Sequence, residues 1–109
     1  MLLERKTAVV TGCNRGIGKA ILEDMAKHGA DVFAVVRKEN SEFTLFCQEL
    51  EKKYEVNIQR VYADFSKEDD VRKAAKEILH EKKDIDILVN NIGIANPLNM
   101  FTMIRMESI

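Results

Sequence analysis

Three glycines, Gly12, Gly16 and Gly18, lie between an apolar run and an amphipathic segment. Residues 6–12, KTAVVTG, are typical of a short buried strand, and residues 15–28 have helical spacing. In such a unit the first glycine permits a tight turn, the second lets a pyrophosphate approach the backbone, and the third lets the helix pack close to the sheet. Free amides and the helix dipole attract phosphates there. The loop predicts a nucleotide-phosphate site, with a purely structural turn as the alternative.

The helix expected at residues 15–28 has one apolar face. Ile17, Ile21 and Met25 recur every four residues, and charged residues lie opposite. Gly29 is a typical helix terminator. We therefore expect the face with the two isoleucines and the methionine to be buried.

The alternation of strand and helix continues along the chain. Further apolar strands are expected at residues 30–37, 56–65 and 85–94, the last including a loop. Runs such as VFAVV and IDILV do not alternate with polar residues, which is typical of strands covered on both faces. The pattern predicts a single α/β domain over residues 1–109, with a parallel sheet, right-handed crossovers and helices on both faces.

The second and third helices have candidate capping residues at their starts. Asn40 or Ser41 precedes apolar residues at helical spacing, and Ser66 precedes the third helical pattern. Side-chain oxygens at these positions accept hydrogen bonds from free helix amides. We expect these residues to be N-caps.

Composition excludes several classes of function. The chain has 109 residues, of which 46% are apolar and 32% are charged, and 17 basic residues nearly balance 18 acidic ones. This balance disfavours a general nucleic-acid or membrane-surface binder. No apolar run approaches the roughly 20 residues of a membrane-spanning helix, and the two cysteines lack metal-site spacing. We expect a cytoplasmic protein that binds neither nucleic acid, nor membrane, nor metal.

The cysteines and histidines have structural interpretations. Cys13 lies in the glycine loop, where it is either a spacer or a redox-sensitive thiol, and Cys47 falls on an expected buried helix face. His28 and His80 lie in the last turns of expected helices, where they complement the helix dipole. We favour the spacer and core interpretations.

Three segments together resemble one known family. TGCNRGIG at residues 11–18 is similar to the TGxxxGIG loop of the classical short-chain dehydrogenase/reductases, and NNIG at residues 90–93 resembles their NNAG motif, with Ile92 in place of alanine. Asp64 and Phe65 resemble the acidic and apolar pair that contacts adenine in that family. The resemblance implies a Rossmann-type doubly wound parallel sheet, of which this chain is the N-terminal portion, with strand order 3-2-1-4.

The resemblance also implies a set of cofactor-binding residues. Asn90 would tie the central strands together through side-chain to backbone hydrogen bonds, whereas Asn91 and Gly93 would border the cofactor. The expected cofactor-binding residues are Gly12, Asn14, Arg15, Gly16, Ile17, Gly18, Arg37, Asp64, Phe65, Asn91 and Gly93.

The end of the second strand indicates the cofactor. An acidic residue there binds the ribose of NAD, whereas a basic residue favours the 2′-phosphate of NADP. Here the residues are Arg37 and Lys38, and Arg15 in the loop would be a second guanidinium for the same phosphate. We predict a preference for NADP(H) over NAD(H); the alternative is that these cations are ordinary solvated residues.

The acid–base residues that the family uses are not matched. In the family, a tyrosine with a lysine four residues later acts in hydride transfer, together with a serine. Tyr54 and Tyr62 are followed four residues later by Ile58 and Ser66, so no catalytic residue is assigned. We therefore expect the chain to be an incomplete part of a longer enzyme, and the apolar tail at residues 95–109 to pack on the remainder.

Two functions remain open. The first is an NADP(H)-dependent carbonyl reductase with a small-molecule carbonyl or alcohol substrate, similar to the 3-oxoacyl-carrier-protein reductases. The second is a noncatalytic nucleotide-binding or interaction module. An open sheet edge and the apolar tail also predict self-association into a homo-oligomer.

Overall fold

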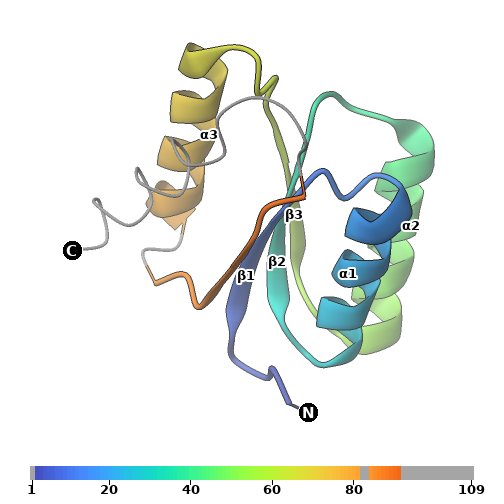
Figure 1. Ribbon diagram of the computed structural model, residues 1–109. Coiled ribbons are helices and arrows are strands. Elements are labelled where there is room, and N and C mark those ends of the chain that lie inside the picture. The colour runs from blue at the N-terminus through green and yellow to red at the C-terminus, as the bar shows by residue number, and fades with distance from the viewer. Residues whose placement is uncertain (1, 82–83, 92–109) are drawn as a thin grey trace.

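The computed structural model describes residues 2–81 and 84–91 and has the predicted α/β architecture. Its strands are all paired in parallel in the order β3-β2-β1-β4 (Figure 1), which confirms the predicted strand order. The elements in chain order are β1 (Thr7–Thr11), α1 (Gly16–Lys27), β2 (Asp31–Val36), α2 (Ser41–Tyr54), β3 (Ile58–Tyr62), α3 (Glu68–Glu81) and β4 (Ile87–Val89).

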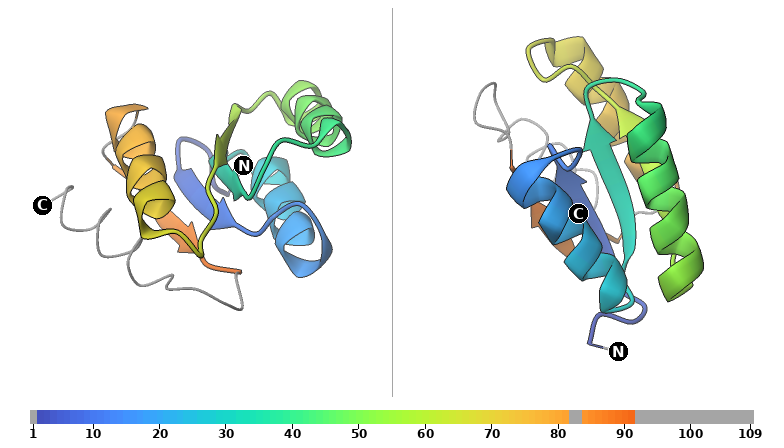
Figure 2. Two further views of the ribbon diagram at one scale, coloured as in Figure 1. Left: turned by 90° about the horizontal axis from the view of Figure 1, so that it is seen from above. Right: turned by 90° about the vertical axis from the view of Figure 1, so that its right-hand side faces the viewer.

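Helices cover both faces of the sheet. Helices α1 and α2 lie together on one face and α3 lies on the other (Figures 1 and 2). Successive side chains of a strand point to opposite faces, so Ala8 and Val10 of β1 join the core under α1 and α2, whereas Val9 joins the core under α3. Every residue of β1 is buried, because both of its faces are covered. This explains why the strand reads as a continuous apolar run.

The buried face of α1 differs from the prediction. Gly18, Leu22 and Ala26 are the buried residues of this helix, whereas Ile21 is only half-buried and Ile17 is 72% exposed. The predicted residues and the buried residues form two adjacent lines on the helix surface, and in each line the residues are four positions apart. Hydrophobicity alone favoured the predicted line, because its side chains are larger. The line that starts at a glycine is buried instead, because only a glycine fits the close approach of the helix start to the sheet.

The helix ends confirm some capping predictions and correct one. The Asn40 side chain accepts a hydrogen bond of 3.1 Å from the Phe43 amide, so Asn40 is the N-cap of α2. The His28 ring lies 2.8 Å from the Asp24 carbonyl at the end of α1, as expected for a residue that binds free helix carbonyls. The N-cap prediction for Ser66 is wrong, since α3 begins at Glu68 and the Ser66 hydroxyl donates to Asp64.

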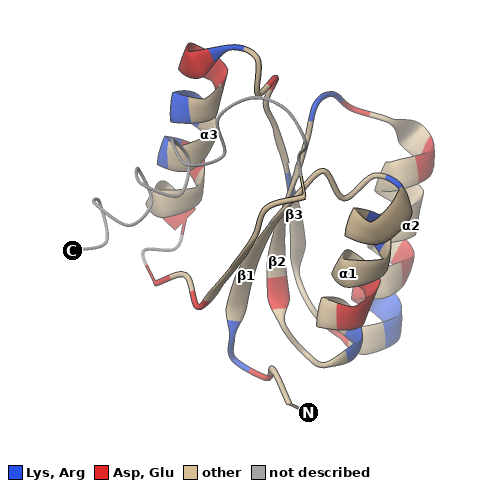
Figure 3. Cartoon of the chain, viewed as in Figure 1, with Lys and Arg blue, Asp and Glu red and all other residues tan. Residues whose placement is uncertain are grey.

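The parallel register brings the carboxyl ends of the strands to one edge of the sheet. Just beyond β1, the Gly12 amide donates to the Val35 carbonyl of β2 at 3.0 Å, and the Ala63 amide, just beyond β3, donates to Val36 at 2.9 Å. Ligands of open parallel sheets bind at this edge. Charged residues lie mainly on the helices and connections, with basic segments in the loop after β2 and at the start of α1 (Figure 3). Within residues 2–81 and 84–91, no helix is long and apolar enough to cross a bilayer.

The assignment of the buried face of α1 can be tested with two alanine substitutions. Leu22→Ala is expected to lower the free energy of unfolding by about 2–5 kcal/mol, because it empties a fully buried site. Ile17→Ala, on the adjacent line, is expected to change it by less than about 0.5 kcal/mol, because Ile17 is 72% exposed. Urea unfolding of both variants measures the difference. Equal losses would contradict the assignment.

Candidate nucleotide-binding site

The glycine loop adopts the conformation that its sequence predicts. Gly12 and Gly16 have φ angles of 61° and 60°, in the left-handed region that glycine tolerates best. Arg15 is the N-cap of α1, but its side chain makes no capping hydrogen bond, and the first turn of the helix has no acidic residue. A Cβ at Gly16 would have no atom within 4 Å. The helix start is therefore open to an anion.

Gly18 is where α1 contacts the sheet most closely. A Cβ at Gly18 would collide with the carbonyl oxygen of Gly12 and would lie 2.6 Å from Asn91 Nδ2. That amide nitrogen donates a hydrogen bond of 3.3 Å to the same carbonyl oxygen. The prediction that Gly18 permits close helix–sheet packing is confirmed.

Thr11, which was not among the predicted site residues, connects the loop to β4. Its side chain is fully buried, and its Oγ1 accepts a hydrogen bond of 3.0 Å from the Asn91 amide. The same hydroxyl lies 3.4 Å from both the Val89 carbonyl and Asn90 Oδ1. A polar residue that ends an apolar strand directly before the first glycine was the available signal.

Among the described residues, the side chain of each of the two asparagines contacts the end of β1 or the loop. Both join β4 to the end of β1, but Asn90 contacts the Thr11 hydroxyl, whereas Asn91 makes the side-chain to backbone hydrogen bond, to Gly12. This bond fixes the Asn91 side chain beside the loop. Two further motif positions, Ile92 and Gly93, lie outside the described residues.

A hollow at the start of α1 gathers six residues in a volume of about 450 Å³. Five of them come from the glycine loop and the first turn of the helix, and the sixth comes from the end of β4. They are Gly12, Asn14, Arg15, Gly16, Ile17 and Asn91. All six are among the residues predicted from the sequence to bind the cofactor.

A second cleft, of about 180 Å³, lies between the ends of β1, β2 and β3. It has Gly12 and Asn14 in common with the first hollow, so the two adjoin each other at the loop. Apolar side chains and polar groups both line it, which suits a flat ring with polar edges. The lining residues are Gly12, Asn14, Val35, Val36, Arg37, Ala63, Asp64, Phe65 and Ser66.

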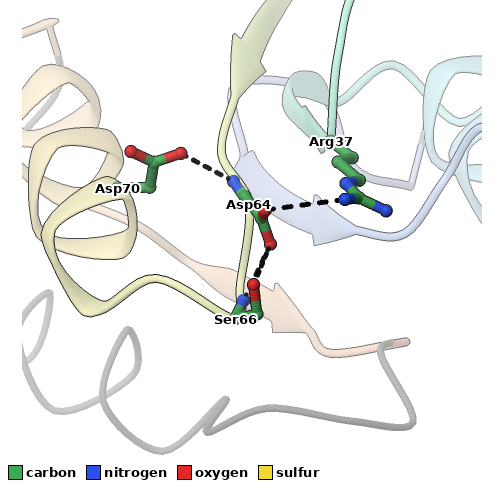
Figure 4. Close-up of polar contacts among 4 residues, drawn as sticks. All are labelled: Arg37, Asp64, Ser66 and Asp70. Atoms are coloured by element: carbon green, nitrogen blue, oxygen red, sulfur yellow. Dashed lines mark hydrogen bonds and ion pairs between the residues drawn. The ribbon is translucent and has the colours of Figure 1, made fainter.

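Asp64 carries a fixed carboxylate in this second cleft (Figure 4). Its Oδ1 accepts hydrogen bonds from the Ser66 hydroxyl at 2.6 Å and from the Ser66 amide at 2.9 Å. Its Oδ2 lies 3.7 Å from a guanidinium nitrogen of Arg37. The Ser66 bonds, followed by the charges of Arg37 and Lys67, hold the pKa of Asp64 below its usual range. Asp64 is therefore anionic at neutral pH.

Cys13 lies on the inner side of the loop, and Cys47 lies on the buried face of α2. Both thiols are fully buried, and Cys13 Sγ donates to the Val10 carbonyl at 3.6 Å. Burial, together with the nearby Cys47, raises the pKa of Cys13 to about 12. A thiol that stays protonated at neutral pH is a poor nucleophile, which supports the spacer interpretation.

The fold and the loop define a class of nucleotide-binding α/β protein, and comparison with known proteins identifies the family. Residues 6–109 match the short chain dehydrogenase family, and the chain belongs to it. The chain is 37% identical over 92 residues to the 3-oxoacyl-(acyl-carrier-protein) reductase FabG of Aquifex aeolicus. This match covers 84% of this chain and 37% of that protein. It is 34% identical over 90 residues to the inactive hydroxysteroid dehydrogenase-like protein 1 of Homo sapiens, covering 83% and 27% of the two chains.

Solved structures show the same architecture. L-sorbose reductase from Gluconobacter frateurii, complexed with NADPH and L-sorbose, superimposes with a TM-score of 0.85 at 23% identity, covering 97% of this chain and 48% of that one. The alcohol dehydrogenase of Thermococcus sibiricus, complexed with 5-hydroxy-NADP, has a TM-score of 0.69 at 30% identity, covering 76% and 35%. The chain spans about 26% to 37% of the length of the curated relatives that it matches.

The contact at Gly18 can be tested by adding one methyl group. Gly18→Ala is expected to destabilise the fold by about 1–3 kcal/mol, because the new Cβ must displace the Gly12 backbone and break its bond to Asn91. Urea unfolding measures the loss. Glu23→Ala is the matched control on the exposed side of the same helix, with an expected change below about 0.5 kcal/mol. A Gly18→Ala variant as stable as this control would contradict the close contact.

Proposed function

We propose that this chain is the nucleotide-binding part of an NADP(H)-dependent oxidoreductase that reduces a carbonyl to an alcohol. The observation that carries the cofactor choice is the end of β2, where Arg37 lines the cleft and Lys38 follows it. A carboxylate at this position would bind the ribose hydroxyls of NAD, whereas a guanidinium is suited to the 2′-phosphate of NADP.

The start of α1 supports the same choice. Arg15 is exposed at the N-cap, where a cation is disfavoured by the helix dipole unless an anion lies nearby. A pyrophosphate at the amides of Gly16 and the next residues would supply that anion, and the 2′-phosphate would supply another. Arg15, which lines the hollow, and Arg37, which lines the cleft, would then contact the 2′-phosphate from two sides.

The remaining residues would hold the other parts of the cofactor. Phe65 would contact adenine with its ring, and Asp64 would contact adenine with its carboxylate. Asn14 and Ile17 would lie along the phosphates, and Asn91, together with Gly93, would border the neighbouring ribose. Gly12 and Gly18 would act by keeping the backbone of the loop in place. When bound, NADPH would supply the hydride for the reduction.

For the substrate we propose a 3-oxoacyl thioester or a compound like it. The FabG relative carries this group in its name, as does the very-long-chain 3-oxoacyl-CoA reductase of Anas platyrhynchos, which is 35% identical over 88 residues. The NADP-dependent 3-hydroxy acid dehydrogenase of Schizosaccharomyces pombe, 32% identical over 93 residues, has in its name a 3-hydroxy acid, the alcohol form of a 3-oxo acid. Other relatives, such as the farnesol dehydrogenase of Aedes aegypti, have different substrates in their names.

We propose a homo-oligomer in a cytoplasmic setting. Among the described strands, β3 and β4 are the edges of the sheet, and an edge with free backbone groups is a site for pairing with another chain. Both cysteines are free thiols, which fits a reducing compartment.

The cofactor choice can be tested by removing one guanidinium. Arg37→Gln is expected to weaken NADPH binding about tenfold and to leave NADH binding within about twofold, because only NADPH has the phosphate that this charge contacts. Calorimetric titration of both cofactors measures the dissociation constants. Lys73→Gln, which removes an exposed charge on α3, is the matched control. Equal dissociation constants for NADPH and NADH in the unchanged chain would refute the proposal.

A noncatalytic nucleotide-binding or interaction module is the second candidate. It is favoured by the human relative whose name describes it as inactive.

The chain alone is expected to bind NADPH without oxidising it in the presence of a 3-oxoacyl thioester, because no tyrosine–lysine pair is present for proton transfer. NADPH absorbance over time is the measurement, with FabG as the positive control. Turnover that persists after removal of host reductases would contradict this expectation. Joining the chain to the remaining part of a family member and recovering turnover would favour the enzyme over the module.

A further inference from the structure

The Asp64 carboxylate has two differently engaged oxygen atoms. Oδ1 is held by two short hydrogen bonds from Ser66, at 2.6 and 2.9 Å. The backbone is also fixed, because the Asp64 amide donates a hydrogen bond of 3.1 Å to Asp70 Oδ2 on the first turn of α3 (Figure 4). Oδ2 faces Arg37. The carboxylate is thus anchored from one side and presents its other side to the guanidinium.

Arg37 is much less constrained than its partner. Its side chain is 78% exposed, whereas that of Asp64 is 20% exposed. The 3.7 Å between the guanidinium nitrogen and Oδ2 is too long for a good hydrogen bond. The contact is therefore an ion pair in which the carboxylate stays in place and the guanidinium is free to turn toward another anion.

Taking Arg37 as the residue that meets the 2′-phosphate, we propose that Asp64 is a specificity-determining residue that reduces the preference of the cleft for 2′-phosphorylated nucleotides. This inference rests on the proposed function, because it assigns the adenosine half of the cofactor to this cleft. Asp64 would act in two ways. Its carboxylate would compete with the incoming phosphate for the Arg37 guanidinium, and its negative charge would repel the phosphate.

The size of the effect follows from the charges. A phosphate that contacts Arg37 carries up to two negative charges and lies within about one Debye length of the Asp64 carboxylate at 0.1 M salt. Repulsion over such a distance in a solvent-exposed cleft corresponds to about a three- to tenfold change in affinity. A ligand without the 2′-phosphate avoids this repulsion, while its adenine meets the same surroundings.

Two small ligands isolate the contribution of the phosphate. Adenosine 2′,5′-bisphosphate and adenosine 5′-monophosphate differ only in the 2′-phosphate, so the ratio of their dissociation constants cancels any contact of Asp64 with adenine. Calorimetry on the chain at 0.1 M salt gives this ratio. Asp64→Asn is expected to shift it about three- to tenfold in favour of the bisphosphate.

A matched control separates this effect from a general change in charge. Asp69→Asn removes one exposed carboxylate from the first turn of α3, at a residue that does not line the cleft. It is expected to leave the ratio within about twofold, because Asp69 is exposed to solvent and salt and does not line the cleft.

A second measurement needs no substitution and applies even where Asp64→Asn does not fold. Coupling between two binding events is reciprocal. The bisphosphate is therefore expected to raise the pKa of the Asp64 carboxyl in the unchanged chain, and the monophosphate to raise it less. Carbon NMR of the side-chain carboxyl across a pH titration, with each ligand in turn, follows this shift.

The outcomes distinguish failure of the proposed function from failure of the role proposed here for Asp64. A chain that binds neither nucleotide refutes both the proposed function and this inference. Binding of both ligands with an unchanged ratio in Asp64→Asn, or equal carboxyl shifts with the two ligands, overturns this inference alone. A ratio that moves toward the monophosphate also overturns it, because Asp64 would then be orienting Arg37 toward the phosphate.

Discussion

The close approach of α1 to the ends of β1 and β4 is the contact on which the site depends. Because Gly18 has no side chain, the Gly12 carbonyl can receive a hydrogen bond from Asn91, and the helix start can lie directly over the strand ends. Thr11 adds a second bond to Asn91 from the buried side. The direction of the first helix amides is thus fixed by contacts between residues about 80 positions apart in the chain.

This constraint explains both the shape of the loop and its suitability for the anion that we propose it binds. The backbone turns through left-handed conformations at Gly12 and Gly16, and the open side of the second glycine leaves room beside the helix amides. A residue with a side chain would pay about 1–2 kcal/mol for each such conformation. The amides gain no carboxylate cap from the first turn of the helix, so their partial positive charge stays available for a ligand.

The continuous apolar strands could be predicted from the sequence, because apolar periodicity is a local signal. The strand order was predicted only through the resemblance to a known family, which rests on the glycine loop and on the segments at residues 64–65 and 90–93. The buried face of α1 could not be predicted, since the choice between the Ile17 and Leu22 lines depends on how closely Gly18 meets the sheet. Ser66 was misassigned for a related reason. Its hydroxyl donates to the Asp64 carboxylate, and α3 begins two residues later, at Glu68. The position of the helix start relative to the end of β3 is not visible in the local sequence pattern.

Cys13 shows how the loop separates its structural side from its ligand side. A thiol near a helix start is expected to have a lowered pKa, yet here burial outweighs the dipole and raises the pKa of Cys13 to about 12. The thiol donates inward to Val10, while the next residues, from Asn14 to Ile17, are exposed. A neutral inward side chain leaves no negative charge beneath the amides. The loop can therefore present an electropositive outer surface, and the repulsion that a phosphate meets comes from Asp64 across the cleft.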